Sequence, residues 1–162
     1  MNKVCLFFLM LLCISFSLSG KTGTTQIYAR SFPYPFLGAG IGIEHSIKDN
    51  LYMQGGLDIC NRHETALAYR HISPYLGFHF KIPDRNKFNV IIGFSVAILE
   101  KRESVMGKYS TLPAYGLGLG AEYYIGTRWN LRLGIELLGG TVISEGFFIA
   151  PLTYVGLGYR FK

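Results

Sequence analysis

A histidine and a serine two residues apart are the clearest candidates for catalysis. His71 and Ser73 lie in an alternating segment, and side chains two apart on a β-strand share a face. The imidazole could take the proton of the Ser73 hydroxyl as that oxygen attacks an ester, with a carboxylate orienting the histidine. Two residues at this spacing arise easily by chance, so the pair needs support from its surroundings.

Glycines and charged residues also recur at a spacing of two residues in other segments. The pattern Gly-x-Gly-x-Gly-x-Glu ends at Glu44 and again at Glu122. A phosphate-binding loop needs a glycine turn that leads into a helix, whereas a constant spacing of two places all four residues on one face of a strand. Arg132 and Glu136 follow the same period in a later segment. These residues are therefore candidates for an ion-pair cluster on one face of a sheet.

The segments that carry these residues are predicted strands, because apolar residues alternate with small or polar ones. We predict strands at residues 24–30, 36–47, 51–60, 69–82, 88–99, 112–125, 129–138 and 147–161. The connections at 48–50, 83–87 and 126–128 are tight turns, and those at 61–67, 101–111 and 139–146 are longer and more polar. Short turns at one end and longer loops at the other are typical of a membrane β-barrel. We predict an all-β, eight-stranded, antiparallel, up-and-down transmembrane β-barrel.

The two faces of these strands differ sharply. One face carries large apolar residues, such as Leu117 and Leu119, and the other carries glycine with scattered charges. A soluble lipocalin-like barrel would turn the apolar face inward, but its outer surface would then be largely bare glycine. Rings also flank the strands near the turns, as in a membrane-interface girdle; they are Phe88, Tyr123, Trp129, Tyr159 and Phe161. We predict that the apolar face meets lipid, and keep the soluble periplasmic ligand-binding barrel as an alternative.

The first residues predict export. Lys3 precedes an apolar run from Val4 to Leu18 that is too short for a comfortable membrane helix, which is typical of a secretory signal peptide. We predict a signal peptide at residues 1–19 and a single barrel domain at 20–162. Only Cys60 would remain in the exported chain, so no disulfide framework is expected.

Inside such a barrel, buried charges must be paired. If the 126–128 turn is symmetric about Thr127, Glu122 lies opposite Arg132. We predict a structural ion-pair cluster in the lumen made of Glu44, Glu122, Arg132, Glu136 and Arg160. The alternative is a gate in which the pairs exchange partners and briefly open a pore.

Basic residues gather in or beside the predicted outer loops. They could contact the phosphates of lipopolysaccharide; they are Arg62, Arg70, Lys101, Arg102 and Lys108. No metal-ligand spacing is present, and no dense basic patch of the nucleic-acid-binding kind. We expect no cofactor, metal or nucleic acid.

The export signal, the eight alternating strands and the ending Tyr159-Arg160-Phe161 together resemble the OmpA/OmpX-like small outer-membrane β-barrel family. The final Lys162 departs from that family, whose members usually end on the aromatic residue itself. The resemblance implies a monomer in the bacterial outer membrane, surrounded by its lipids and lipopolysaccharide and inserted by the barrel-assembly machinery.

The His71 and Ser73 pair resembles the catalytic pair of outer-membrane lipid A deacylases, which are also eight-stranded barrels. Pro74, however, stands where that family has asparagine, and the pair lies early in the chain and on the inward face. We therefore predict a non-enzymatic barrel with no catalytic residues, which serves envelope integrity or surface interaction. Its lumen is plugged by polar side chains, so it is not a general porin. The lipid A-modifying hydrolase is the alternative.

Overall fold

The computed structural model describes residues 23–33, 37–64, 67–83, 87–102, 109–142 and 146–161. The predicted signal peptide lies outside these residues. Eight strands account for nearly all of the described chain; they are β1 (Thr25–Phe32), β2 (Leu37–Lys48), β3 (Leu51–Glu64), β4 (Leu67–Pro83), β5 (Phe88–Arg102), β6 (Tyr109–Ile125), β7 (Trp129–Val142) and β8 (Gly146–Phe161). In the part of the chain described, no helix is long and apolar enough to cross a membrane.

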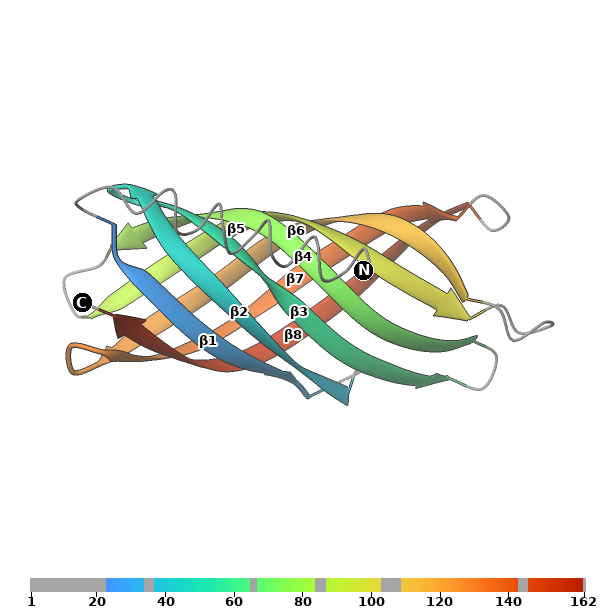
Figure 1. Ribbon diagram of the computed structural model, residues 1–162, viewed down its shortest axis with the longest axis horizontal. Coiled ribbons are helices and arrows are strands. Elements are labelled where there is room, and N and C mark those ends of the chain that lie inside the picture. The colour runs from blue at the N-terminus through green and yellow to red at the C-terminus, as the bar shows by residue number, and fades with distance from the viewer. Residues whose placement is uncertain are drawn as a thin grey trace, which may run out of the picture.

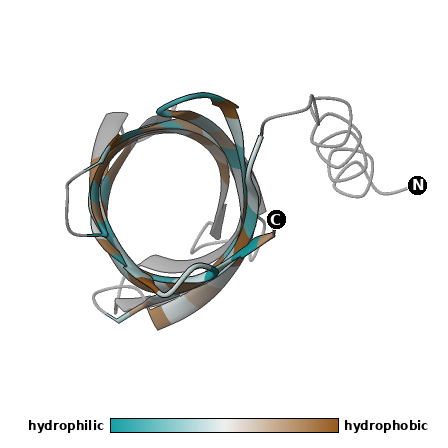
Figure 2. Ribbon diagram, turned by 90° about the vertical axis from the view of Figure 1, so that its left-hand side faces the viewer, coloured by the Kyte–Doolittle hydropathy of each residue, from teal (hydrophilic) through white to brown (hydrophobic). Residues whose placement is uncertain are grey.

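The strands close into one barrel in which each pairs antiparallel with its neighbours in sequence (Figures 1 and 2). The ring is completed by β8 and β1, whose pairing runs from Thr25 opposite Phe161 to Ser31 opposite Val155. Closure leaves no free strand edge around this part of the wall. The predicted eight-stranded, up-and-down topology is confirmed.

The barrel has the opposite polarity to a soluble protein. Leu117 and Leu119 of β6 expose 66% and 57% of their surface, whereas Glu44 and Glu122 expose none. Large apolar side chains on all eight strands share this outward exposure; they include Ile27, Ile41, Ile59, Phe78, Phe94, Leu133 and Leu157. The predicted face assignment is confirmed. The soluble alternative is wrong, because it requires the apolar face to be inside.

The strands extend further than the sequence predicts at the end opposite the C-terminus. The predicted loops at 61–67, 101–111 and 139–146 contain strand at both of their ends, since pairing continues to Glu64 opposite Leu67 and to Arg102 opposite Tyr109. In the third hairpin it continues to Val142 opposite Gly146. A strand can contain polar residues when its backbone groups pair across a hairpin. A prediction that ends each strand where apolar alternation stops therefore ends it too early.

These extensions form separate two-stranded ribbons. The pairing of β4 with β5 stops at Tyr75 opposite Ala97, and that of β6 with β7 stops at Ala114 opposite Gly140. Beyond these levels the β3–β4, β5–β6 and β7–β8 hairpins continue without ladder partners from neighbouring hairpins in the described residues. The β1–β2 hairpin ends well short of the other three (Figure 1). The barrel therefore has one even end, with short turns, and one end with three projecting hairpins.

Candidate functional site: the barrel lumen

The β6–β7 hairpin positions the centre of the lumen network. Its register places Glu122 opposite Arg132, as predicted. The Arg132 guanidinium donates from Nη2 to Glu122 Oε1 at 2.8 Å and to Glu44 Oε1 of β2, across the lumen, at 3.1 Å. All three side chains are buried. A single guanidinium thus joins carboxylates from two distant strands.

A fourth charged residue, Lys81 of β4, completes this layer. Its Nζ lies 2.5 Å from Glu44 Oε1 and 3.0 Å from Glu122 Oε2. Two carboxylates therefore share two cations, and each cation contacts both carboxylates. We call Glu44, Lys81, Glu122 and Arg132 the inner quartet. The period of two places Lys81 on the same glycine-bearing face as the carboxylates. The sequence prediction left Lys81 out of the cluster, and a comparison of the number of cations with the number of carboxylates on that face would have included it.

Polar side chains surround the inner quartet on the side of the short turns. Gln26 donates from Nε2 to Glu44 at 2.6 Å, and Asn130 donates to the Gln26 carbonyl oxygen at 3.0 Å. Tyr124 donates its hydroxyl to Glu122 at 2.8 Å and accepts from the Arg160 guanidinium. Among the described residues, Arg160, predicted as a cluster member, is therefore linked to Glu122 through the Tyr124 hydroxyl and not by an ion pair of its own.

Glu136 lies in a second layer and has a different cation. Its carboxylate accepts a hydrogen bond from Ser95 and lies 3.5 Å from Nη1 of Arg30. Arg30 also donates two N–H groups to the Asp58 carboxylate. We call Arg30, Asp58, Ser95 and Glu136 the outer layer. The prediction that Glu136 joins Arg132 is wrong, since the two residues are four apart on β7 and so lie at different depths.

Aromatic and neutral polar groups separate the two layers. The Tyr28 hydroxyl donates to Gln54 at 2.8 Å and lies 2.6 Å from that of Tyr75. The Arg132 guanidinium lies 4.8 Å from the Tyr28 ring, and that of Arg30 lies 4.3 Å from the Tyr75 ring. These rings cover the guanidinium faces with π-electron density, which favours a desolvated cation. Both charged layers are therefore packed against the same aromatic layer.

An apolar group follows the outer layer on the side of the projecting hairpins. Phe32 and Leu152 are buried against each other and contact Leu138 and Tyr154. The Phe32 ring centroid lies 5.2 Å from the Arg30 guanidinium carbon. Charged, aromatic, charged and apolar levels thus succeed one another along the lumen.

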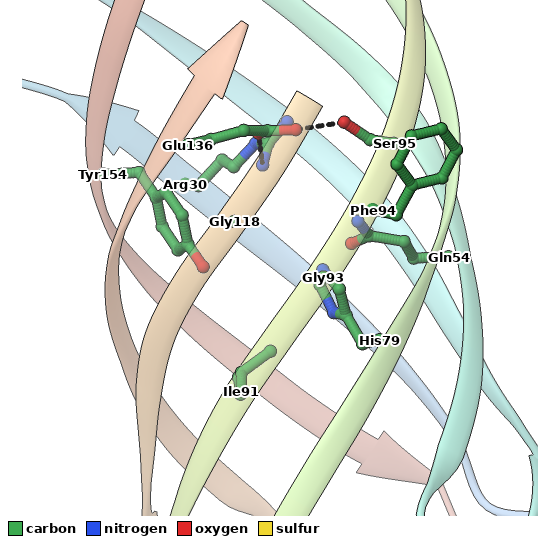
Figure 3. Close-up of a pocket in the computed structure, with 10 residues that line it drawn as sticks. All are labelled: Arg30, Gln54, His79, Ile91, Gly93, Phe94, Ser95, Gly118, Glu136 and Tyr154. Carbon is green, nitrogen blue, oxygen red and sulfur yellow. Dashed lines mark hydrogen bonds and ion pairs between the residues drawn. The ribbon is translucent and has the colours of Figure 1, made fainter. Parts of the chain in front are cut away.

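Glycines make room for these side chains. A Cβ at Gly134 would lie 2.7 Å from the Tyr154 hydroxyl, and one at Gly120 would lie 2.9 Å from it. Gly118 differs, because a Cβ there would meet nothing closer than two carbonyl oxygens at 3.9 Å. Beside Gly118, between the two charged layers, lies a cavity of about 10 Å³ (Figure 3). That volume is about the size of one water molecule.

The candidate catalytic pair is only partly described. Ser73 is 5% exposed and stands opposite Asp58 in the β3–β4 register. The Asp58 carboxylate is already bound by two Arg30 donors, so it is not free to orient a histidine. The side chain of His71 lies outside the described residues. In the described residues, no group of three metal-binding side chains occurs.

Four of the five residues of the predicted basic rim belong to the projecting hairpins. Arg62, Arg70, Lys101 and Arg102 lie in the projecting parts of β3, β4 and β5, but their side chains are outside the described set. Lys108 lies outside it altogether.

Solved structures of small outer-membrane barrels share this architecture. The N-terminal barrel of Pseudomonas aeruginosa OprF matches with a TM-score of 0.64 at 13% identity, covering 86% of this chain and all of that one. Neisserial surface protein A matches with a TM-score of 0.68 at 10% identity, covering 86% and 97%. The attachment invasion locus protein Ail of Yersinia pestis matches with a TM-score of 0.51 at 14% identity, also covering 86% and 97%.

The chain folds as a small outer-membrane-type β-barrel of the OmpA/OmpX-like kind. At these identities the likeness concerns the fold alone. No protein-family model and no curated protein matches the sequence. The features specific to this chain are therefore the side chains of its lumen, its rim and its projecting hairpins.

Proposed function

We propose that the protein is an integral, monomeric barrel of the bacterial outer membrane, exported by residues 1–19 and inserted by the barrel-assembly machinery. The inverted polarity of the wall carries this proposal. Outward-facing Leu, Ile and Phe side chains would be costly in water, whereas Glu44 and Glu122 are buried. Only a hydrocarbon solvent outside the barrel makes both arrangements favourable. By the turn rule, the even end faces the periplasm and the projecting hairpins face outward.

The lumen is proposed to be plugged. Eight strands enclose a space just wide enough for side chains to fill, and the charged, aromatic and apolar levels lie across it. The cavity beside Gly118 and a second one of the same volume, lined by Arg30, Arg132 and Tyr154, each have room for about one water. Such a barrel would not act as a general porin.

The first expected result concerns location. The protein should remain in the membrane fraction after carbonate extraction and should migrate differently on gels before and after boiling. The apolar wall requires lipid or detergent, and a closed barrel in the gel's SDS sample buffer unfolds only on heating. Recovery from the periplasm without detergent would contradict the proposal.

The projecting hairpins are the proposed contact surface. Three ribbons extend beyond the membrane-spanning wall, and they carry Arg62, Arg70, Lys101 and Arg102. Arginine and lysine suit the phosphates of lipopolysaccharide, so a role in envelope integrity or surface interaction follows. Function on such a scaffold commonly lies in the connections between its strands.

Catalysis is proposed to be absent, which gives a second expected result. Asp58 stands opposite Ser73 in the β3–β4 register, and its carboxylate is bound by Arg30, so it is not available to orient a catalytic histidine. Lipid A from a host that produces the wild-type protein should therefore give the same mass spectrum as lipid A from hosts producing Ser73→Ala or His71→Ala. A deacylated species present only with wild type would establish the hydrolase alternative instead.

A further inference from the structure

An aromatic surface lies at the even end of the barrel, outside the lumen. Trp129 of β7 packs edge-on against Tyr159 of β8, with ring centroids 4.9 Å apart. Tyr159 packs in the same way against Phe161, with centroids 5.3 Å apart. Trp129 and Phe161 are exposed and Tyr159 is half-buried. The three rings form a continuous ladder across two strands at the edge of the apolar wall.

A cation is held against this ladder. Arg128, in the β6–β7 turn, is exposed, and its Nη1 donates to the Tyr159 hydroxyl at 3.1 Å. No other hydrogen bond or ion pair of its guanidinium occurs among the residues the structure describes, and the same is true of the Trp129 indole N–H. We call Arg128, Trp129, Tyr159 and Phe161 the rim surface. It presents unused N–H donors directly beside exposed rings.

The charge of this end favours an anionic ligand. Among the described residues of its turns, Lys48, Lys87 and Arg128 are exposed cations, and Asp49 is the exposed acid. Tryptophan and tyrosine settle at the headgroup level of a bilayer, and arginine suits a phosphate because it offers several donors in a fixed fork. We propose that the rim surface is a binding site for an anionic phospholipid. Arg128 and the indole N–H bind its phosphate, and the rings contact its glycerol and upper acyl chain.

Trp129 reports on this site directly, because it is the only tryptophan in the chain. The barrel would be refolded into phosphatidylcholine vesicles that contain increasing amounts of phosphatidylglycerol, with bromine on the acyl chains of one lipid at a time. Quenching of Trp129 fluorescence then gives the relative affinity of the two lipids beside the ring. We expect a preference of about fivefold for phosphatidylglycerol at low salt, the effect of one arginine at an anionic surface.

Matched variants separate the site from net charge. Arg128→Gln should reduce the preference to about one, and Tyr159→Phe should reduce it in part, because the hydroxyl that positions Arg128 is lost. Lys48→Gln removes the same charge on the opposite side of the barrel, since β4 and β5 on one side and β8 and β1 on the other separate the two turns. It should retain the preference. Equal effects of Arg128→Gln and Lys48→Gln, or no preference in the wild type, would overturn the inference.

The inference rests on the proposed membrane location, but the quenching experiment distinguishes failure of the lipid site from failure of the proposed location. A chain that does not insert would show no quenching by either brominated lipid. An inserted barrel that is quenched equally by both lipids would leave the proposed location intact and refute only the lipid site.

Discussion

Replacing Arg132 with alanine is expected to destabilise the folded barrel by about 3–5 kcal/mol, the usual cost of removing one partner of a buried ion pair. Arg132 is 3% exposed and binds Glu122 and Glu44. Without it, Lys81 remains as the quartet's one cation for two carboxylates that are fully buried. The free energy of unfolding would be measured by urea titration of the protein refolded in lipid vesicles.

A double-mutant cycle shows whether the loss comes from stranded charge. Glu122→Gln in the Arg132→Ala background leaves Glu44 with Lys81, so the quartet is neutral again and part of the loss should be recovered. Glu136→Gln is the matched control, because Glu136 lies in the outer layer with Arg30 and its coupling to Arg132 should be much smaller. A coupling near zero for Glu122 and Arg132 would mean that water enters the lumen and screens the pair. A rise in single-channel conductance would then favour the gate over the plug.

Periodicity alone predicted the fold well. Residues two apart share a face in any β-strand, so the side of the wall on which each residue of β5 or β6 lies follows from the sequence once the strands are located. The opposition of Glu122 and Arg132 also followed from counting back from a tight turn. Strand ends were predicted less well, because paired polar ribbons such as Lys101 opposite Ser110 leave no apolar alternation to detect.

The composition of the lumen network was predicted only in part. Contacts within a hairpin follow from its turn, but contacts across the lumen depend on the shear of the closed barrel, which fixes the depth of each residue. Lys81 reaches Glu44 from β4, and Arg30 reaches Asp58 from β1, without being near in sequence. Glu136 was assigned to Arg132 because both lie on one face of β7, although four residues separate their depths.

Changing Leu119 to arginine is expected to cost about 2–4 kcal/mol in the bilayer, because the new charge would lie near the middle of the hydrocarbon layer. Leu119 is central in the exposed apolar run of β6, between Tyr115 and Tyr123. Gly118→Ser, one residue away, should be tolerated far better. Its Cβ would meet nothing closer than 3.9 Å, and its hydroxyl would enter the cavity of Figure 3. Unfolding free energies in vesicles would compare the two.

Gly120→Ser provides the control on the same strand and face. Its Cβ would lie 2.9 Å from both the Leu133 carbonyl oxygen and the Tyr154 hydroxyl, so it should be less stable than Gly118→Ser although the added atoms are identical. We expect the free energy of unfolding to be lower for both Leu119→Arg and Gly120→Ser than for Gly118→Ser. The first comparison tests the lipid-facing wall, and the second tests packing in the lumen. If Leu119→Arg proved as stable as Gly118→Ser, position 119 would face water, and the proposed lipid environment of the wall would be wrong.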